Sequence, residues 1–261
     1  MSHNGIAGTV AVVTGAAGGI GRAVAARLAA EDAVVAAADV DAQGLASLVG
    51  GLHADGYKAE GYTADVRDSA AVETLFDAVE RDLGPVAHTV NVAGVLATGD
   101  ATDTCDARWE HLFAVNTAGV FHVCRAAARR MRPRGSGTIT TVGSNAAGVP
   151  RSGMAAYGAS KAAATMFTKS LGLELAPQGI RCNVVSPGST DTPMQRGMWD
   201  GDEGARAVIA GSPERFRVGV PLGRIAAPDD IADAVCFLAS SSARHITMHD
   251  LYVDGGATLR A

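Results

Sequence analysis

The sequence predicts an α/β fold: one doubly wound parallel sheet of about seven strands, with helices on both faces. Short segments rich in β-branched residues alternate with longer alanine-rich segments along the chain. The predicted strands are almost continuously apolar, which is typical of parallel strands covered on both faces. The 261 residues contain no linker, internal repeat or break in composition. We therefore expect a single domain over residues 1–261, large enough to bury a substantial core.

The predicted strands are short apolar segments bounded by glycine or polar turn residues. They are Thr9–Thr14, Val34–Asp39, Tyr57–Ala64, Val86–Asn91, Gly137–Gly143, Ile180–Ser186 and Asp250–Val253. The segments between them are rich in alanine, the residue that favours helix most strongly. They predict helices over Gly19–Ala30, Ala42–Ala54, Ser69–Leu83, Cys105–Met131, Ala156–Ala176 and Pro228–Ser240.

One segment departs from this alternation. Residues Pro193–Pro221 contain glycine, methionine, tryptophan and arginine but no strand pattern. They follow the predicted strand Ile180–Ser186, at the edge where an open α/β sheet binds its ligand. We therefore expect residues 193–221 to form a lid over a substrate.

Composition argues against several classes of protein. A formal charge of −5 gives no reason to expect a nucleic acid partner. No apolar run approaches the roughly 18 residues that a membrane span needs. Met1–Gly5 show no signal-peptide pattern, the four cysteines form no Cys-x-x-Cys pair, and the seven histidines do not cluster at ligand spacing. We expect a cytoplasmic protein with reduced thiols, no metal and no membrane partner.

Three glycines mark a turn between the first strand and the first helix. Gly15, Gly19 and Gly21 let the backbone approach a pyrophosphate, whose charge the helix N-terminus favours. Asp39 ends the second strand, eighteen residues after Gly21, where a carboxylate accepts hydrogen bonds from ribose hydroxyls. A 2′-phosphate there would meet like charge, so the pattern favours NAD over NADP. A purely structural turn and a solvated Asp39 are the simpler alternatives.

Tyr157 and Lys161 lie four residues apart, about one helical turn, and Ser144 lies thirteen residues before Tyr157. On one helix face, an ammonium about 5 Å from a phenol favours phenolate by roughly 3 kcal/mol, or about two pKa units. We therefore expect the pKa of Tyr157 to fall towards neutrality, where the side chain acts as a general base. Together with a hydride acceptor at the glycine turn, the pair indicates alcohol oxidation or ketone reduction.

Further motifs follow in a fixed order from about Gly8 to the C-terminus. They are Thr14–Gly21, Ala64–Val66, Asn91–Gly94, Asn116, Ser144, Tyr157 with Lys161, Pro187–Thr192 and Val253–Gly256. In this order and spacing they resemble the short-chain dehydrogenase/reductase family, which has a Rossmann-type fold. Val92 replaces the second asparagine of the family pattern, and we expect this change to be tolerated at a strand end.

The resemblance implies a set of cofactor contacts. Ile20 would contact the pyrophosphate, while Asp65 and Val66 would border the adenine. Asn91 and Gly94 would support the adenosine half. The remaining implied contacts, towards the nicotinamide end, are Tyr157, Lys161, Pro187, Gly188, Thr190 and Thr192.

The resemblance also implies a catalytic tetrad of Asn116, Ser144, Tyr157 and Lys161. Ser144 would hydrogen-bond the reacting oxygen while Tyr157 accepts the hydroxyl proton. Lys161 would lower the pKa of Tyr157 and bridge to the nicotinamide ribose. Asn116 would position a water that links Lys161 to solvent. Each residue taken singly has a structural explanation, but the ordered set behind a dinucleotide turn indicates catalysis.

Three segments carry a closer resemblance within the family: Pro150–Tyr157, Arg181–Arg196 and His245–Asp250. They are similar to those of 2,3-dihydro-2,3-dihydroxybenzoate dehydrogenases, which supply the catechol unit of siderophores. The implied reaction is NAD-dependent oxidation of the C3 hydroxyl of a cyclohexadiene diol, followed by tautomerisation to an aromatic ring. Aromatisation makes the reaction effectively one-way.

The carboxylate of such a substrate requires a cation, and an arginine fork matches it bidentately. Arg151, six residues before Tyr157, is the first candidate. Arg196 in the lid is the second, and Gln195 would add a hydrogen bond. Apolar side chains that would wall the ring are Met154, Met194 and Trp199. The alternative is that both arginines are solvated or pair with the lid acids Asp200, Asp202 and Glu203.

Asn145 departs from the pattern of this subfamily, in which an aspartate follows the catalytic serine. If this residue touches a ring substituent, an amide there changes the preferred substrate. The second candidate substrate is therefore trans-2,3-dihydro-3-hydroxyanthranilate, which carries an amine at C2. An ammonium would prefer aspartate and a hydroxyl accepts either residue, so both substrates stay open.

Three other readings remain. A general carbonyl reductase, such as a 3-oxoacyl reductase, would share the tetrad, but Asp39 and Pro193–Arg196 argue against it. A non-catalytic NAD-binding regulator would not need an intact tetrad. The third is that the chain mainly builds an assembly. The family usually forms homotetramers through two long helices, here Cys105–Met131 and Ala156–Ala176, so we expect assembly to accompany catalysis.

Overall fold

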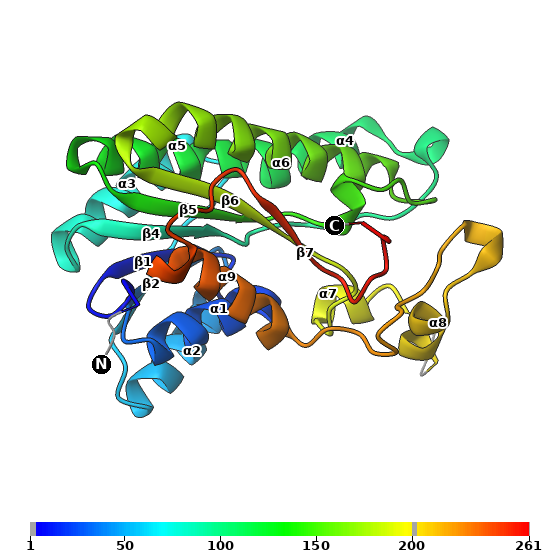
Figure 1. Cartoon of the computed structure of the whole chain (residues 1–261), viewed down its shortest axis with the longest axis horizontal. Helices are drawn as coiled ribbons and strands as arrows, with labels where there is room; N and C mark the ends of the chain where they lie inside the picture. Colours follow the sequence, from blue (N-terminus) through cyan, green and yellow to red (C-terminus); the bar gives the residue numbers. More distant parts are fainter. Residues whose placement is uncertain (1–3, 200–202, 261) are drawn as a thin grey trace.

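Seven parallel strands form one sheet in the computed structural model, which describes residues 4–199 and 203–260 (Figure 1). The strands are β1 Val10–Thr14, β2 Val34–Asp39, β3 Ala59–Thr63, β4 Val86–Asn91, β5 Gly137–Val142, β6 Ile180–Pro187 and β7 Asp250–Val253. Their order across the sheet is β3-β2-β1-β4-β5-β6-β7. The predicted fold class is confirmed, and the predicted strand ends differ from these by at most two residues.

The strand order reverses between β1 and β4. β2 and β3 lie on one side of β1, whereas β4 to β7 continue on the other. Successive crossover connections therefore leave the sheet in opposite directions at this point, and a crevice opens beyond the carboxyl ends of β1 and β4.

Helices cover both faces of the sheet. In Figure 1, α1 Gly19–Ala30, α2 Ala42–Ala54 and α9 Pro228–Ala239 lie below it. On the upper face lie α3 Ser69–Asp82, α4 Asp106–Phe113, α5 Val120–Met131 and α6 Ala155–Leu175. Two apolar clusters correspond to these faces, one built on Val24, Leu28 and Val235, the other on Phe76 and Met131. The sheet thus separates two cores, as expected for continuously apolar strands.

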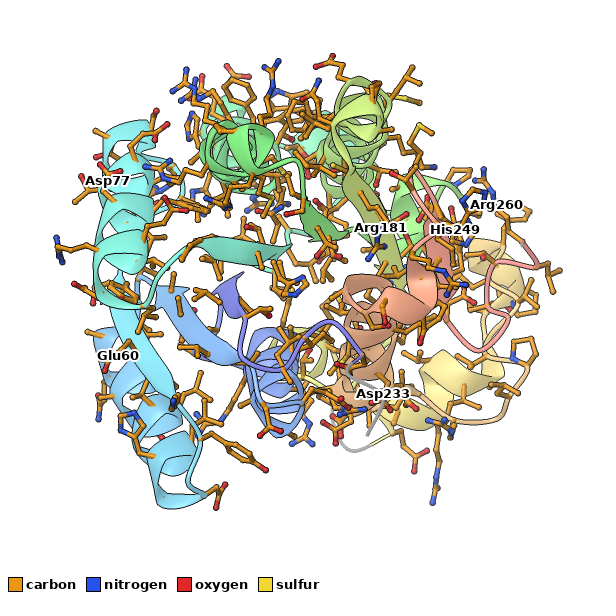
Figure 2. The ribbon with its side chains drawn as sticks, turned by 60° about the vertical axis from the view of Figure 1, so that its left-hand side comes forward. Glu60, Asp77, Arg181, Asp233, His249 and Arg260 are labelled. Atoms are coloured by element: carbon orange, nitrogen blue, oxygen red, sulfur yellow. The ribbon has the colours of Figure 1, made fainter. Side chains whose placement is uncertain are left out.

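Arg181 of β6 anchors the carboxyl end of α9. Its Nη1 donates to the carbonyl of Leu238 at 2.7 Å, and its Nη2 donates to those of Ala239 and Ser240 at 3.1 Å each. Figure 2 labels Arg181 beside the helix that carries Asp233. These bonds satisfy carbonyl groups that a helix end leaves without intrahelical partners, and so fix α9 against the sheet.

The predicted helix Cys105–Met131 is helical from Asp106 to Met131, but it is not a regular α-helix throughout. A wider π-helical turn, η2 Ala114–Gly119, separates α4 from α5. Two contacts hold this turn in place. Asn116 hydrogen-bonds the backbone of Val95 through both atoms of its amide, and Gly119 packs so closely on Val66 that a Cβ would lie 2.7 Å from its Cγ2.

The lid segment contains two short helices that the sequence pattern did not indicate. They are α7 Pro193–Arg196 and α8 Gly204–Ala210, which extend beyond the sheet in Figure 1. A bridge between Ser212 and Arg217 closes a small hairpin after α8. Short 3₁₀ turns elsewhere are Ala101–Asp103, Arg132–Arg134, Asn145–Ala147, Ala176–Gln178, Pro213–Arg215 and Ser241–Ala243. The predicted lid includes residues 200–202, which lie outside the described residues.

Candidate active site

A cavity of about 880 Å³ opens at the carboxyl ends of the strands. Its wall is formed by the glycine turn, the ends of β2, β4 and β5, the start of α6 and the lid. Most of the residues predicted for the cofactor and substrate line it. These are Gly15, Gly19, Ile20, Gly21, Asp39, Asp65, Val66, Gly94, Ser144, Arg151, Met154, Tyr157, Lys161, Pro187, Gly188, Thr190, Thr192 and Gln195.

The glycine turn requires glycine at defined positions. Gly15 and Gly19 have φ of +68° and +50°, in the left-handed region that glycine adopts without strain. A Cβ at Gly15 would lie 2.6 Å from the backbone nitrogen of Ala93, and a Cβ at Gly21 would overlap the Gly15 carbonyl. Gly18 instead faces open space in the cavity wall. The turn packs tightly against β4 on one side and leaves room for an anion at the start of α1.

Asp39 is held at the end of β2 by the backbone. Its Oδ2 accepts a hydrogen bond from the Ala17 nitrogen at 3.0 Å, and its Oδ1 accepts one from the Asp41 nitrogen at 3.1 Å. The carboxylate is partly exposed and lines the cavity. It is therefore fixed in the place where a ribose edge would meet it.

One cation lines the same end of the cavity. Arg67 donates to both carboxylate oxygens of Asp65, with the shortest contact at 2.6 Å from Nη2 to Oδ2. The Arg67 guanidinium holds the pKa of the Asp65 carboxyl below its usual range. Because this arginine is already engaged, it does not offset the negative charge of Asp39.

Asn91 lies away from the cavity, although we expected it to support the adenosine half. Its side chain is buried, and Nδ2 donates to Thr141 Oγ1 and Cys124 Sγ, each at 3.2 Å. Asn91 therefore joins β4 to β5 and α5. Val92, the departure from the family pattern, packs against the apolar core, and its nitrogen donates to Thr14 Oγ1 at 3.2 Å.

Tyr157, Lys161 and Ser144 meet in the cavity wall, and all three are buried. Burial raises the pKa of Tyr157 above its ordinary value, and a hydrogen bond with Ser144 opposes that rise. Burial also lowers the pKa of Lys161 to about 8, and its Nζ donates to the Val142 carbonyl at 3.0 Å. In this structure the pKa of Tyr157 is raised rather than lowered, because burial disfavours the phenolate and the Lys161 ammonium, which bonds the Val142 carbonyl, does not offset it.

Asn116 is buried in the π-helical turn and does not itself line the cavity. Its Oδ1 accepts from the Val95 nitrogen at 2.9 Å, while Nδ2 donates to the Val95 carbonyl at 2.9 Å and to Ser160 Oγ at 3.0 Å. A Cβ at Gly94 would lie 3.2 Å from Asn116 Oδ1 and 3.3 Å from Lys161 Nζ. The amide and the ammonium thus both face Gly94.

The two arginines predicted for a carboxylate have different environments. Arg151 lines the cavity, and within residues 4–199 and 203–260 its buried Nε has no hydrogen-bond partner. Arg196 does not line the cavity. It forms a bidentate ion pair with Asp191, at 2.6 and 2.8 Å, and its side chain is 62% exposed. The structure therefore places Arg196 outside the cavity wall, in an ion pair with an acid five residues earlier.

The lid supplies an arginine that the sequence argument missed. Arg217 lines the cavity, and its Nε is buried without a partner among the described residues. Of the acids expected to pair with Arg151 or Arg196, Glu203 pairs with Arg206 instead, while Asp200 and Asp202 lie outside the described residues. The signal available in the sequence was the pair Arg215 and Arg217, two cations at alternate positions late in the lid.

The remaining predicted substrate residues lie where expected. Met154 and Gln195 line the cavity, together with Met194 and Trp199. Asn145 also lines it, but its amide nitrogen donates to Asp254 Oδ2 at 3.2 Å.

Among residues 4–199 and 203–260, no cluster of three or more His, Cys, Asp or Glu side chains has an arrangement suited to a metal ion. Over the same two ranges, every helix is too short or too polar to cross a bilayer.

Comparison with known families agrees with this geometry. A family model described as enoyl-(acyl carrier protein) reductase matches residues 15–258. The chain belongs to the short-chain dehydrogenase/reductase family. Dehydrogenases of this family use a nicotinamide cofactor, and the protein is an enzyme of this family.

Particular members of the short-chain dehydrogenase/reductase family are similar over the whole chain. The sequence is 55% identical over 259 residues to 2,3-dihydro-2,3-dihydroxybenzoate dehydrogenase of Bacillus subtilis (strain 168), covering 99% of each chain. It is 42% identical over 262 residues to the vibriobactin-specific 2,3-dihydro-2,3-dihydroxybenzoate dehydrogenase of Vibrio cholerae, again covering 99% of each. The crystal structure of gox2181 superposes with a TM-score of 0.92 at 32% identity, covering 100% of both chains. The predicted resemblance is confirmed.

Proposed function

We propose that this enzyme oxidises 2,3-dihydro-2,3-dihydroxybenzoate to 2,3-dihydroxybenzoate with NAD, in the biosynthesis of a catechol siderophore or a related natural product. The observation that carries the proposal is Arg151, which lies in the same cavity as Tyr157 and Ser144 and whose Nε has no partner in the part of the chain that the structure describes. A guanidinium in that position suits a ring carboxylate. Similarity to dehydrogenases named for this substrate, over the full chain, supports the same substrate.

NAD fits the adenosine end of the cavity. The turn at Gly15–Gly21 offers backbone and the start of α1 to a pyrophosphate, and the Asp39 carboxylate suits ribose hydroxyls. A 2′-phosphate would be repelled by Asp39, and Arg67 is held by Asp65. The residues that would hold the cofactor are Gly15, Gly19, Ile20, Gly21, Asp39, Asp65, Val66, Gly94, Tyr157, Lys161, Pro187, Gly188, Thr190 and Thr192.

When bound, the nicotinamide supplies the acceptor for the hydride that leaves C3. Ser144 donates a hydrogen bond to the C3 oxygen and so orients the hydroxyl towards Tyr157. Tyr157 removes the hydroxyl proton as the C3–H bond breaks. Proton removal needs the phenolate, which burial disfavours in this structure, so the Lys161 ammonium on the same helix would offset that cost when cofactor and substrate are bound. Asn116 holds the backbone of Val95, and its amide and the Lys161 ammonium both face Gly94. The C2 proton of the resulting ketone then shifts to oxygen, which gives the aromatic product.

The lid, residues 193–221, would cover the ring side of the cavity. Met154, Met194 and Gln195 line this side, which provides apolar surface and one amide for a substituted ring. Arg196 is not included in this set, since it lies outside the cavity wall and pairs with Asp191.

Trans-2,3-dihydro-3-hydroxyanthranilate is the weaker candidate. An ammonium at C2 calls for a carboxylate in the substrate half of the cavity. Asn145 presents an amide there, and Asp254 behind it already accepts hydrogen bonds from Asn145, Gly256 and Thr258. The facing cations Arg151 and Arg217 would repel an ammonium further. A hydroxyl at C2 meets neither difficulty.

A general carbonyl reductase using NADPH is disfavoured by Asp39, and a non-catalytic regulator by the buried Ser144, Tyr157 and Lys161 in one cavity wall.

We further propose a cytoplasmic homotetramer. Cys124, Cys182 and Cys236 are buried free thiols, which suits a reducing compartment. Exposed apolar side chains on α4, α5 and α6 suit an interface between subunits. They are Trp109, Phe121, Met166 and Leu173.

The test is NADH formation from synthetic 2,3-dihydro-2,3-dihydroxybenzoate, measured beside its 2-amino analogue and a 3-oxoacyl substrate with NADPH. We expect kcat/KM for the dihydroxy acid to exceed the other two values by at least about tenfold. The ammonium of the 2-amino analogue and the 2′-phosphate of NADPH would each be buried without a partner of opposite charge, which costs that much or more. Tyr157→Phe should bind NAD normally by calorimetry but lose turnover. Preference for the amine or for NADPH would contradict the proposal, as would full activity in Tyr157→Phe.

A further inference from the structure

Among the arginines that line the cavity, two are partly buried, and they come from different parts of the molecule. Arg151 lies in the loop before α6, and Arg217 lies in the lid after the 3₁₀ turn Pro213–Arg215. Each is partly buried, and each has a buried Nε without a partner among residues 4–199 and 203–260. Two arginines with an unsatisfied Nε in one cavity are unusual, since arginines in protein interiors normally pair with acids or carbonyl groups.

The backbone of Arg217 is firmly positioned. Its nitrogen donates to the Ser212 carbonyl at 2.9 Å, and its carbonyl accepts from the Ser212 nitrogen at 3.0 Å. Gly211 and Gly219 pack against this hairpin with φ of +80° and +90°, where a side chain would collide with backbone. The Nη2 of Arg217 approaches the Ser152 carbonyl at 3.5 Å. The lid therefore brings Arg217 to the residue that follows Arg151.

The charges around the pair are unbalanced. Burial lowers the pKa of Arg151, and the neighbouring charge of Arg217 lowers it further, while Asp254 acts in the opposite direction. Asp254 is itself engaged by the Asn145 amide, the Gly256 nitrogen and the Thr258 hydroxyl. Burial and the charge of Arg217 both disfavour the Arg151 cation and only Asp254 opposes them, so a further negative charge beside the two arginines would be favourable.

We propose that Arg151 and Arg217 together bind the ring carboxylate of the substrate, one arginine from the core and one from the lid. The inference rests on the proposed function and deepens it: Arg217, not Arg196, is the lid residue that selects a carboxylated ring. A carboxylate has two oxygens and about four lone-pair sites, enough for two guanidinium forks. The carboxylate would also remove the repulsion between the two arginines, so binding would join the lid to the core.

The experiment compares Arg217→Gln, Arg217→Lys, Arg151→Gln and the control Arg206→Gln. Arg206 lies on α8 in the same lid, is 82% exposed and pairs with Glu203, so its replacement tests the loss of a lid charge alone. Circular dichroism and melting temperature establish that each variant folds. Arg217→Lys keeps the charge but loses the fork, and it serves as the milder variant if Arg217→Gln unfolds.

Binding is measured by calorimetry on the complex with NAD, using 2,3-dihydroxybenzoate and the neutral ring catechol as probes. Each of Arg217→Gln and Arg151→Gln removes one partner of a desolvated charge pair. The affinity for 2,3-dihydroxybenzoate should therefore fall by about 30-fold or more in either variant. Catechol affinity should change less than about threefold, and Arg206→Gln should match the wild type for both probes. In turnover, KM for the carboxylated diol should rise while kcat stays within about threefold.

The outcomes separate the two proposals. Failure of the wild type to oxidise the dihydroxy acid would contradict the proposed function, whatever the arginines bind. Unchanged 2,3-dihydroxybenzoate affinity in a folded Arg217→Gln or Arg217→Lys variant would contradict the two-arginine site, even if the wild type turns the acid over. Equal losses for catechol and 2,3-dihydroxybenzoate would also overturn it, because they would indicate a damaged cavity rather than a lost carboxylate contact.

Discussion

The side-chain amide of Asn145 donates a hydrogen bond of 3.2 Å to the carboxylate of Asp254, 109 residues later in the chain. The bond ties the residue after Ser144 to the turn after β7, and both side chains are buried. An aspartate at position 145 would face Asp254 with like charge. In this chain, therefore, the amide supports the site through Asp254, and the expected contact with a ring substituent is not needed to explain it.

Asn145→Ala should destabilise the protein by about 1–3 kcal/mol, because the Asp254 carboxylate loses a buried donor. Urea denaturation followed by circular dichroism measures the change. Thr258→Val removes the other side-chain donor to the same oxygen, at 2.8 Å. If both donors serve one carboxylate, the double variant should depart from additivity. Strict additivity would mean that the two bonds are independent.

Asp39→Asn should weaken discrimination against NADP. The amide retains the shape of the side chain but removes the charge that would repel a 2′-phosphate. We expect the ratio of kcat/KM for NAD to that for NADP to fall by about tenfold or more. An unchanged ratio would show that cofactor choice lies elsewhere, with Arg67 as the next residue to examine, because it lines the same end of the cavity.

Lys161→Met should be more stable than the wild type at pH 7, although it should lose turnover. Burial lowers the pKa of Lys161 from 10.5 to about 8, so the folded state disfavours the ammonium. In the unfolded chain Lys161 keeps its proton up to a higher pH. Its charge therefore lowers the free energy of unfolding of the wild type most below pH 8, and this loss of stability fades between pH 8 and 10.5. The difference should reach at most about 3 kcal/mol.

The control for this prediction is Lys169→Met on the same helix. Lys169 is partly exposed and pairs with Asp250 at 3.3 Å, so its loss should change stability little or lower it slightly. Denaturant curves at pH 7, 9 and 10 compare the three proteins. A Lys161→Met variant less stable than the wild type at pH 7 would show that the bond to Val142 outweighs desolvation.

His88 should make the fold sensitive to acid. Its ring hydrogen-bonds Thr138 Oγ1 at 2.7 Å and the Gly5 carbonyl at 3.3 Å, and burial lowers its pKa from 6.5 to about 4. The unfolded chain binds a proton below pH 6.5 that the folded chain takes up only near pH 4. Stability should therefore fall by about 3 kcal/mol as the pH falls through this window.

Comparing wild type and His88→Asn isolates this contribution, because acidic groups also titrate in the same range. We expect the stability difference between the two proteins to shrink from pH 7 to pH 4, as the wild type loses its advantage. Parallel stability curves would show that His88 is protonated without cost in the fold.

The strands and most helices were predictable because their signals are local. Apolar runs such as Val34–Asp39 specify buried strands, and the spacing of Tyr157 and Lys161 specifies one helix face. Contacts distant in sequence were not predictable. The π-helical turn after Phe113 depends on the Asn116 amide reaching Val95, and the pKa of Tyr157 depends on burial by segments far along the chain.

The arginines of the substrate site also depend on contacts between residues that the sequence pattern does not reveal. Arg196 was predicted from its position in the segment 193–221, whereas its pairing with Asp191 and its place outside the cavity wall follow from the fold. Arg217 was missed because only the folded hairpin at Ser212 brings it towards Ser152. Such placements follow from how the lid packs, which a pattern of residue types does not encode.

The π-helical turn at Ala114–Gly119 makes this stretch of the chain intolerant of changes in length. A wide turn accommodates an additional residue relative to a regular helix. Deleting one residue there would turn everything beyond it by about 100° about the helix axis. Val123 and Met131 would then leave the core that they fill, and Asn116 would no longer reach Val95. Point substitutions in α5 can be absorbed individually, but a single codon lost from this turn would misalign the whole helix.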